Sequence, residues 1–494
     1  MRVLFVSSEI HPLMKTGGLA DVSASLPRAL HSLGHQVTLL MPAYRDALAA
    51  ATPLGVRLIA TRVISGRQVR LLQTRVPRSR NRLWLLDCPA LFDRPGNPYQ
   101  DAQGNDHADN AERFALLCRC AAELAEDRFG IGWIPEVVHC NDWQSALVPL
   151  LLYARRPRPA LVFTIHNLAY QGLFPAEALQ QLELPARYWH PEALEFHGML
   201  SFIKAGIVFA DRVNTVSPRY ATEIRQPAFG HGLDGLLRHR ADALSGILNG
   251  IDTNAWNPAR DPALVRRYGV STLAHKSDNK RALREELGLR PDAGMPLLAF
   301  IGRLVEQKGI DLLLATIPEL IDHPCQAVVL GSGEPDNEYA LAALARAHPG
   351  RIAFRAGYDE ALAHRIEAGA DIFLMPSRFE PCGLNQMYSL RYGTVPVVHA
   401  VGGLADTIVD ATPAALADGS ANGFRFDVDT PAALLAATYR ALALYTQPRI
   451  WRQLQLVGMR SDLSWRRSAR EYEQLYAMAI VDTATPRVFD ILET

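Results

Sequence analysis

Short runs of β-branched and aliphatic residues alternate with helical patterns along almost the whole chain, and this alternation constrains the fold more than any other feature. "RVLFVSS" (Arg2–Ser8) and "QVTLLMP" (Gln36–Pro42) flank a helical stretch from about Leu19 to Leu33. Two strands joined by a helix form a βαβ unit, whose strands run parallel. The first half of the chain is therefore predicted to form a doubly wound parallel sheet.

Further strands are expected where short apolar runs end in turn residues. In the first half these runs cover residues 82–87, 136–142, 160–167, 212–217 and 245–250; in the second half they cover residues 297–303, 326–334, 352–357, 371–377 and 394–399. The run from Val56 to Val76 alternates around a glycine turn. It predicts an antiparallel hairpin inserted beside the parallel strands.

The rhythm is interrupted by "NGIDTNAWNPARDP" (Asn249–Pro262), which we interpret as a hinge because it is rich in Asn, Pro and Asp. A chain of 494 residues is too long for one hydrophobic core. We expect a first domain at residues 1–250, a second at 251–463 and a C-terminal helical segment at 464–494. Ligands of such folds bind beyond the carboxyl ends of the strands, so two facing sheets would share one cleft.

Composition disfavours several classes of partner. The 51 basic residues balance the 51 acidic residues, so the overall charge does not favour nucleic acid or an anionic membrane. No apolar run is long enough to cross a bilayer, and the first residues read as a buried strand and not as a signal peptide. The six cysteines show no CxxC pair and no disulfide spacing. We expect a cytoplasmic protein without nucleic-acid or membrane partners.

The pentapeptide "GGLAD" occurs twice, at Gly17–Asp21 and at Gly402–Asp406, each time between a predicted strand and a predicted helix. A helix start exposes unpaired N–H groups and about half a positive charge, so it favours a phosphate. Lys15 precedes the first copy and could add a cation. A tight turn with an incidental lysine is the alternative.

Two loops of the second half carry charges that suit a nucleotide sugar. In "GRLVEQKG", Arg303 and Lys308 lie around a strand–helix turn, where a planar fork and a point charge could hold a diphosphate. In "SRFEPCGLNQ", Glu380 precedes Pro381 at the start of a helix. The alternatives are solvated loop charges and a first-turn acid stabilised by the helix dipole.

The first half places polar residues at two strand ends. His166 ends one predicted strand, and Asp142 ends another. A lone histidine is more often structural than catalytic, and Asp142 could be a helix N-cap. Asp427 and Asp429 suggest a divalent metal, but the Thr-Pro that follows favours capping of a helix. We predict no metal site.

Taken together, these motifs resemble those of bacterial glycogen synthases and plant-type starch synthases. The resemblance extends from "SSEIHPLMKTGGLADV" (Ser7–Val22) to "GGLADTI" (Gly402–Ile408) and includes, in order, "HCNDWQ", "FTIHNLAYQG", "IGRLVEQKG" and "SRFEPCGLNQ". It implies the α/β GT-B fold, with two Rossmann-like domains facing a central cleft and a final helix that crosses back to the first domain. It also implies transfer of glucose from ADP-glucose to the non-reducing 4-OH of an α-1,4-glucan, with retention and without a cofactor.

The resemblance assigns roles to individual residues. The catalytic roles fall on Glu380, His166, Lys308 and Arg303. The other substrate contacts fall on Lys15, Gly18 and Thr407 at the phosphates, Tyr358 at the base, Asn249, Cys382 and Gly383 around the glucosyl group, Tyr99 and Asp142 on the acceptor side, and Asp21 at the nucleotide sugar. Leu384 is also assigned to substrate binding. The two GGLAD turns would then converge on the donor phosphates from opposite domains. Asn385 stands where many relatives have Thr, and we expect that departure to be neutral.

Two other interpretations remain open. A glucan phosphorylase of similar fold would need a lysine that binds pyridoxal phosphate, and no lysine lies in a matching context. A catalytically silent glucan- or nucleotide-binding protein is disfavoured because every charged motif residue is present. No pair of carboxylates matches the arrangement of a retaining glycosidase, so electrostatic stabilisation of the leaving diphosphate is the expected route. The stretch from Asp482 to Thr494 fits no pattern.

Overall fold

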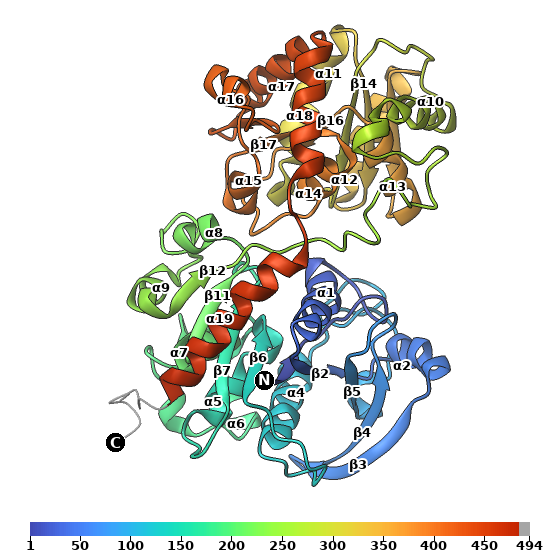
Figure 1. The fold of residues 1–494 in the computed structure, drawn as a ribbon. Helices are drawn as coiled ribbons and strands as arrows, with labels where there is room; N and C mark the ends of the chain where they lie inside the picture. Colours follow the sequence, from blue (N-terminus) through green and yellow to red (C-terminus); the bar gives the residue numbers. More distant parts are fainter. Residues whose placement is uncertain (484–494) are drawn as a thin grey trace. The chain divides into compact units, whose positions relative to one another are not determined.

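The computed structural model describes residues 1–483, and the chain divides into two compact units. Of the described residues, the first unit contains 1–250 and 465–483, and the second contains Ile251–Ser464. Each unit is built around its own sheet (Figure 1). Among the described residues, no helix is both long and apolar enough to span a membrane. Most of the terminal stretch that fits no pattern lies outside the described residues.

The first unit holds a nine-stranded sheet of order β12-β11-β7-β6-β1-β2-β5-β4-β3. Seven of its strands run parallel to one another, and each overlaps a run predicted from the sequence: β1 (Arg2–Val6), β2 (Gln36–Pro42), β5 (Arg82–Asp87), β6 (Val137–Asn141), β7 (Ala160–Ile165), β11 (Arg212–Thr215) and β12 (Leu244–Gly246). The predicted hairpin is also confirmed. It forms β3 (Arg57–Ile64) and β4 (Arg67–Arg75) around Ser65 and Gly66, both with positive φ.

The helices of the first unit include one that returns from the end of the chain. They are α1 (Gly18–Ser32), α2 (Arg45–Ala51), α3 (Pro89–Phe92), α4 (Asn110–Ala125), α5 (Leu147–Tyr153), α6 (Ala178–Gln181), α7 (Phe202–Phe209), α8 (Pro218–Glu223), α9 (Asp234–His239) and α19 (Trp465–Thr483). Helix α19 contacts α1 and β7 and lies along this unit (Figure 1). The predicted return of the final helix is thus confirmed.

Buried polar side chains join α19 to the sheet. Thr164 Oγ1 donates its proton to Asn214 Oδ1 at 2.6 Å. The same hydroxyl therefore accepts a hydrogen bond from His139 Nε2, which lies 2.6 Å away. Tyr476 Oη then donates to His139 Nδ1 at 2.8 Å. Burial lowers the pKa of His139 to about 3, which keeps the ring neutral. Asn214 Nδ2 also donates to Tyr472 Oη at 3.1 Å, so two tyrosines of α19 complete this network.

The first unit also contains a three-stranded sheet that its sequence does not predict. Its order is β8-β10-β9, with β8 (Leu173–Pro175), β9 (Glu195–Phe196) and β10 (Met199–Ser201). Each of these strands has only two or three residues, too few for an alternating pattern to be recognised.

The second unit holds a parallel six-stranded sheet of order β15-β14-β13-β16-β17-β18. Its strands are β13 (Leu297–Ile301), β14 (Gln326–Gly331), β15 (Ile352–Ala356), β16 (Ile372–Met375), β17 (Val395–His399) and β18 (Phe424–Phe426). Only β18 was not predicted, since it has three residues. The helices are α10 (Lys276–Leu287), α11 (Ile310–Asp322), α12 (Pro335–Ala347), α13 (Glu360–Gly369), α14 (Asn385–Tyr392), α15 (Gly402–Thr407), α16 (Pro413–Asp418), α17 (Pro431–Tyr445) and α18 (Pro448–Arg460).

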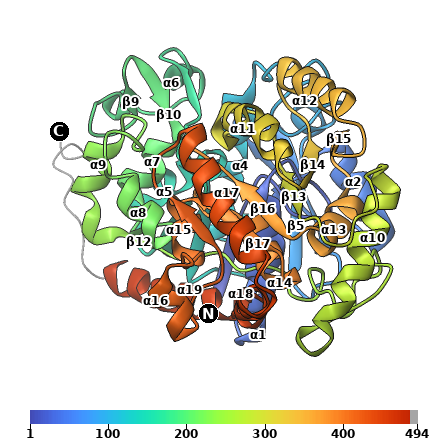
Figure 2. The same ribbon diagram turned by 90° about the horizontal axis from the view of Figure 1, so that it is seen from above.

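The central strand β13 separates two hydrophobic layers. Leu298 and Phe300 join the core beneath α11 and α17. Leu297, Ala299 and Ile301 join a second core with residues of α10 and α13. Successive side chains of a strand point to opposite faces, so helices cover both faces of this sheet (Figure 2).

The Asn/Pro-rich stretch interpreted as a hinge is mostly packed within the second unit. Trp256 is stacked between His364, at 3.9 Å between ring centroids, and Tyr388, at 3.7 Å. Ile251 N donates to Leu463 O at 2.8 Å. Only Asn249 and Gly250 of the stretch precede the boundary between the units. The interpretation of the whole stretch as a hinge is therefore too broad, because stacking on two buried rings holds its middle in place.

Candidate active site

The first GGLAD turn is the exposed start of α1. Gly17 is the N-cap residue, and the space where its Cβ would lie is open. Lys15 Nζ forms an ion pair with Asp21 Oδ2 at 2.9 Å, with side-chain exposures of 33% and 25%. The predicted cation and the acid of the motif are therefore partners across the first turn of the helix. The first amides of α1 have no partner within the helix, as at any helix start.

A buried carboxylate that the sequence analysis did not consider braces this turn. Glu9 Oε2 accepts from Thr16 N at 2.5 Å and from Gly17 N at 3.3 Å, and Glu9 Oε1 accepts from Thr16 Oγ1 at 2.6 Å. Tyr99 Oη donates to the same Oε1 at 2.5 Å. Burial, reinforced by the charge of Glu9, raises the pKa of Tyr99 well above its usual value. Glu9 thus links Tyr99, predicted on the acceptor side, to the turn beside Lys15.

The ends of β6 and β7 bring Asp142 and His166 together. Asp142 is 8% exposed and has φ of 55°, a strained conformation for a residue other than glycine. Its Oδ1 accepts from His166 N at 2.7 Å and from Asn167 N at 3.4 Å. The side chain does not cap the short helix that follows, so the capping alternative is wrong.

The protonation of these two residues follows from their burial. Burial raises the pKa of Asp142 to about 7, although the His166 and Asn167 amides stabilise the anion. Burial lowers the pKa of His166 to about 3, so its ring is neutral near pH 7. Asn141 Nδ2 donates to Val6 O at 3.0 Å, and Asn141 Oδ1 lies 3.0 Å from His166 Nε2. His166 Nε2 therefore carries the proton, and Nδ1 is the acceptor.

In the second unit, the loops after β13 and β16 bring Lys308 to Glu380. Lys308 Nζ lies 2.5 Å from Glu380 Oε2, with side-chain exposures of 21% and 8%. Ser377 Oγ donates to the same oxygen at 3.0 Å. Both contacts are made to Oε2, so the carboxylate is held through one oxygen. Gly309, the N-cap residue of α11, has φ of 66°, and a Cβ there would meet Pro376 O at 2.1 Å.

The second GGLAD turn is also a helix start, but it is buried against the Glu380 loop. Gly403 N donates to Glu380 O at 3.1 Å. A Cβ on Gly402 would lie 2.0 Å from Glu380 O, and one on Gly403 would lie 2.1 Å from Cys382 O. These glycines are required by close packing of two backbone segments. Thr407 Oγ1 donates to Gly403 O at 2.6 Å and so belongs to the same turn.

The remaining predicted residues of the second unit lie on neighbouring loops. Arg303 is exposed after β13 and donates to Gln307 Oε1 at 2.9 Å. Tyr358 is 62% exposed after β15. Gly383, with φ of 71°, and Leu384 lead into α14. Asn385 Nδ2 donates to Ile301 O at 2.7 Å, which ties α14 to β13.

Asn249, in the first unit, has a buried Oδ1 without a hydrogen-bond partner. The residue is 6% exposed. A buried acceptor without a partner is rare in a folded protein, so this oxygen is free to accept a hydrogen bond. It is the one predicted sugar-side contact of the first unit that shows this property among residues 1–483.

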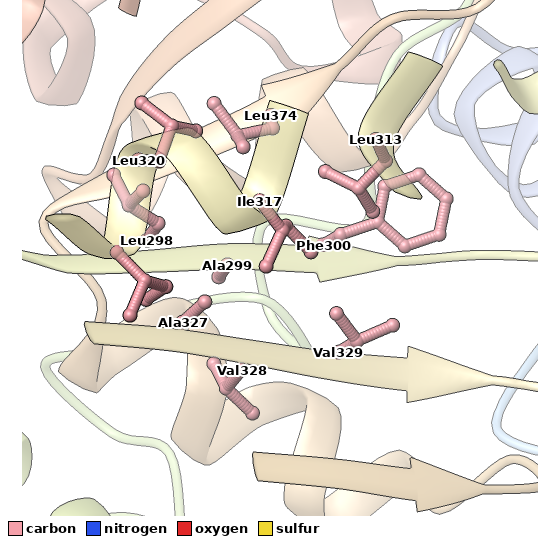
Figure 3. A pocket seen from close by; sticks show the side chains of 11 residues that line it. Leu298, Ala299, Phe300, Leu313, Ile317, Leu320, Ala327, Val328, Val329 and Leu374 are labelled. Carbon is pink, nitrogen blue, oxygen red and sulfur yellow. The ribbon is translucent and has the colours of Figure 1, made fainter. Parts of the chain in front are cut away.

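The second unit also contains a small apolar cavity and the aspartate pair Asp427 and Asp429. A cavity of about 10 Å³ lies between α11 and the strands β13 and β14 (Figure 3). It is lined by aliphatic and aromatic carbon, and it is no larger than one water molecule requires. Asp429 pairs with Arg378 at 3.4 Å, while Thr430 caps α17. Within the described chain, no group of three or more His, Cys, Asp or Glu residues is placed to hold a metal.

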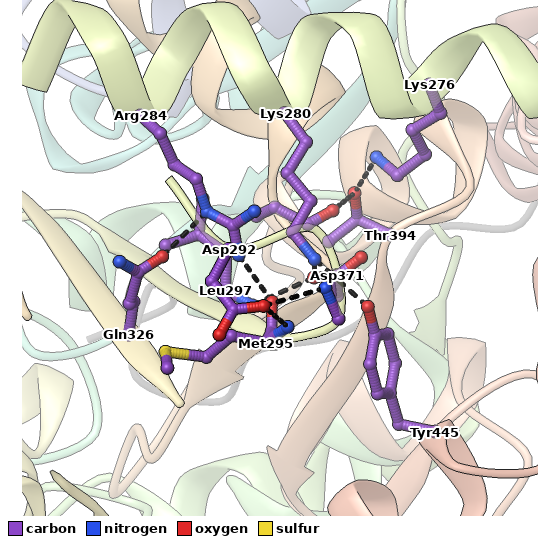
Figure 4. A network of polar contacts seen from close by, with 12 residues as sticks. Lys276, Lys280, Arg284, Asp292, Met295, Leu297, Gln326, Asp371, Thr394 and Tyr445 are labelled. Carbon is purple, nitrogen blue, oxygen red and sulfur yellow. Dashed lines mark hydrogen bonds and ion pairs between the residues drawn. The ribbon is translucent and has the colours of Figure 1, made fainter. Parts of the chain in front are cut away.

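A second charged cluster lies at the amino-terminal edge of the six-stranded sheet (Figure 4). Lys280 Nζ pairs with Asp371 Oδ2 at 2.5 Å, and Lys276 Nζ donates to Thr394 Oγ1 at 2.7 Å. Burial lowers the pKa of Lys276 to about 7. Asp371 and Thr394 directly precede β16 and β17, whereas the loops of Lys308 and Glu380 follow the carboxyl ends of strands. This cluster therefore anchors α10 at the edge away from those loops.

The comparisons with known proteins agree with this arrangement. The family model of the starch synthase catalytic domain matches residues 2–239, and that of glycosyl transferases group 1 matches residues 281–453. Glycogen synthase 1 of Methylococcus capsulatus is 60% identical over 97% of both chains. Glycogen synthase of Marinobacter nauticus is 57% identical over 96% of this chain and 97% of its own. This chain belongs to the glycogen and starch synthase family.

Two solved structures share the fold of this chain over 97% of its length. The catalytic domain of starch synthase IV from Arabidopsis thaliana, bound to ADP and acarbose, matches with a TM-score of 0.87 and 32% identity over 97% of this chain and 99% of its own. Sucrose-phosphate synthase from Thermosynechococcus elongatus, at 17% identity and a TM-score of 0.59, shares the fold. The GT-B fold expected from the resemblance is thus confirmed, and the chain is a glycosyltransferase.

Three polar residues of this synthase were not singled out in the sequence: Glu9, Asn141 and Ser377. Each lies at or just beyond the end of a buried strand, the position from which the other candidates were chosen. Glu9 and Ser377 follow β1 and β16, and Asn141 is the last residue of β6. Only their position after a strand could have identified these three residues, because none of them forms a recognisable motif with a residue nearby in the sequence.

Proposed function

We propose that the chain transfers glucose from ADP-glucose to the non-reducing 4-OH of an α-1,4-glucan, with retention of configuration and release of ADP. The observation that carries this proposal is the 2.5 Å pair of Lys308 and Glu380 at the carboxyl ends of two strands. A cation for a leaving diphosphate lies beside a fixed carboxylate that can face a sugar. The full-length similarity to glycogen synthases supports the same donor and acceptor classes.

The carboxylate of Glu380 is oriented by its contacts. Lys308 and Ser377 both hold Oε2, so Oε1 is the oxygen available to a substrate. In the proposed reaction the bond between the anomeric carbon and the diphosphate oxygen breaks, and a bond to the acceptor 4-oxygen forms. The acceptor proton passes to the departing phosphate oxygen on the same face. Glu380 stabilises positive charge at the anomeric carbon, and Lys308 and Arg303 offset negative charge on the diphosphate.

We assign the first-unit residues to binding. Lys15 and the amides at the start of α1 suit a phosphate. His166, neutral and protonated on Nε2, presents Nδ1 as an acceptor for a sugar hydroxyl. The unpartnered Oδ1 of Asn249 suits a second hydroxyl. Asp142 and Tyr99 remain the proposed acceptor-side contacts.

Transfer of radiolabelled glucose to glycogen tests the proposal. We expect incorporation from ADP-glucose at a higher initial rate than from UDP-glucose, an α-1,4 product, and activity that survives chelation. Glu380→Gln is expected to lower kcat more than it raises KM, because the charge at Glu380 acts mainly in the transition state. No incorporation from either donor, with the protein folded, would instead identify a silent binding protein.

A glucan phosphorylase is separated by its product. Incubation with glycogen and inorganic phosphate would release glucose 1-phosphate from a phosphorylase, and we expect none. The assay uses the full chain, with Glu380→Gln as the control for contaminating activity.

A further inference from the structure

The hairpin of the first unit concentrates positive charge in a chain whose total charge is zero. Between Val56 and Leu86 there is no acidic residue and no lysine. The same segment contains eight arginines, at positions Arg57, Arg62, Arg67, Arg70, Arg75, Arg78, Arg80 and Arg82. The segment spans β3, β4 and β5 and lies at one side of the nine-stranded sheet.

Three of these arginines are neutralised by carboxylates. Arg62 Nε lies 2.5 Å from Glu123 Oε2, and Arg67 Nε donates to Glu112 Oε1 at 2.6 Å. Both acids belong to α4. Arg70 pairs at 2.5 Å with Asp87 at the end of β5. These pairs account for the arginines around the hairpin turn and the neighbouring strand end.

The other five arginines have no such partner. They are exposed, and within residues 1–483 none forms an ion pair or a side-chain hydrogen bond: Arg57, Arg75, Arg78, Arg80 and Arg82. Arg75 lies directly opposite Arg82 in the ladder of β4 and β5. Like charges in opposed positions destabilise a sheet, so this arrangement does not serve stability.

The same surface includes an open strand edge. Strand β3 is the last strand of the sheet and pairs only with β4 (Figure 1). Leu58 is 56% exposed and Val63 is 68% exposed. An edge strand presents backbone donors and acceptors that can pair with an added strand. We call β3 together with the five arginines that have no carboxylate partner the arginine edge.

We propose that the arginine edge is a docking surface for an extended acidic segment of a partner protein, which adds as a strand beside β3. Guanidinium groups pair in bidentate fashion with carboxylates, and the strand edge supplies backbone hydrogen bonds. Exposed Leu58 and Val63 provide contacts for apolar side chains that alternate with the acids. A phosphate polymer would use the arginines but neither the backbone edge nor these apolar side chains, so the acidic polypeptide fits more of the surface.

Within the first unit, this surface is separate from the residues proposed for binding and catalysis. Arg82 begins β5, which runs parallel to β2, and Arg75 is its neighbour in the ladder. The charges therefore cluster where β5 begins, whereas Asp142 and His166 follow the carboxyl ends of β6 and β7. Substitutions in the arginine edge are expected to leave glucose transfer unchanged, so success or failure here is independent of the proposed reaction.

A labelled peptide of about ten residues that alternates Glu and Val tests the proposal by fluorescence anisotropy. We expect saturable binding that weakens as salt rises from about 0.05 M to about 0.3 M. Arg78→Glu with Arg80→Glu, in the loop after β4, is expected to weaken binding at least about tenfold. Arg449→Glu with Arg452→Glu makes the same charge change on exposed positions of α18 and is expected to have no effect.

Three results would overturn the proposal. The first is equal binding by the Arg78/Arg80 variant and by the α18 variant, provided that both retain wild-type melting temperatures. The second is binding of polyphosphate but not of the peptide, which would identify a surface for phosphate polymers. The third is unchanged binding of a peptide with alternate backbone amides methylated, because strand addition requires those N–H groups.

Discussion

The two GGLAD turns share five letters and a position at a helix start, yet they lie in opposite surroundings. Gly17 and the start of α1 are exposed, with open space around the position of a Cβ. Gly402 and Gly403 are buried, and a Cβ on either would meet a backbone oxygen at about 2 Å. The same five residues thus serve the local conformation of a helix start in the first unit, and the close packing of two backbone segments in the second.

A lysine and a carboxylate accompany each turn, and they differ in the same way. Lys15 and Asp21 form an exposed pair whose acid belongs to the motif itself. Lys308 and Glu380 form a part-buried pair in which the carboxylate is the buried partner, and the second GGLAD turn packs against the loop that carries Glu380. Exposed ion pairs contribute little because water screens them, whereas removing one partner of a buried pair leaves an uncompensated charge. Loss of Lys308 is therefore expected to lower turnover more than loss of Lys15.

Lys308→Ala is expected to give the largest effect. Loss of the cation leaves charge on the departing diphosphate unmet and leaves Glu380 without its partner, so kcat should fall by roughly 10³-fold. Lys15→Ala is the matched control and should lower kcat less, because its exposed charge is screened. Steady-state kinetics with ADP-glucose measure both. Equal losses in the two variants would remove the distinction between the pairs.

Gly403→Ala follows in size. Its Cβ would lie 2.1 Å from Cys382 O, so the Glu380–Cys382 loop must shift. We expect a loss of about 3 kcal/mol in the free energy of unfolding, with a large loss of turnover. Gly17 has φ of −155°, and the space where a Cβ would lie is open, so Gly17→Ala should change the free energy of unfolding by less than about 0.5 kcal/mol. Chemical denaturation of both variants decides, and a destabilised Gly17→Ala would contradict the exposed character of the first turn.

Glu9→Gln tests whether the first turn depends on its buried brace. An amide cannot accept from all of the donors that Thr16, Gly17 and Tyr99 direct at the carboxylate. We expect a loss of about 2 kcal/mol in stability and a higher KM for ADP-glucose, with a smaller change in kcat. Tyr99→Phe removes one donor only and should cost less. A wild-type KM in Glu9→Gln would show that the turn is held by other contacts.

The last prediction concerns the pH dependence of stability. It rests on a contrast between two buried carboxylates: Glu380, which pairs with a cation, and Asp142, which does not. The pKa of Asp142 is about 7 in the folded protein, above its usual value. Between about pH 4 and pH 7 the unfolded chain loses this proton while the folded chain keeps it, so stability contributed at this site falls as pH rises and is level above pH 7.

Asp142→Asn removes this titration. The variant should match the wild type near pH 4 and become more stable than the wild type near pH 8, even as activity falls. Melting temperatures measured across this range supply the test. A stability difference that does not change with pH would show that Asp142 titrates normally.

Much of the fold could be predicted because local patterns specify it. The run Gln36–Pro42 forms β2 with the predicted bounds, since a buried parallel strand needs a continuous apolar run. Strand β18 could not be predicted, because a three-residue strand carries no pattern. Trp256 was assigned to a hinge, because stacking on His364 and Tyr388 depends on residues more than a hundred positions away.

The residues of the candidate site could likewise be predicted only where a local motif identifies them. His166 and Glu380 could be selected because they follow recognisable strands within specific motifs. The partnership of Lys308 with Glu380 joins loops 72 residues apart and required the structure. The packing role of Gly403 and the bracing role of Glu9 likewise depend on contacts that no local pattern records.

The position of α19 bears on the order in which the chain acquires its structure during synthesis. Tyr472 and Tyr476 complete the buried network of His139 and Asn214, yet they leave the ribosome after the entire second unit. The second unit is continuous in sequence and has all of its strands before then. Nascent chains should therefore finish the inserted unit first, while the earlier-made sheet waits for its last helix.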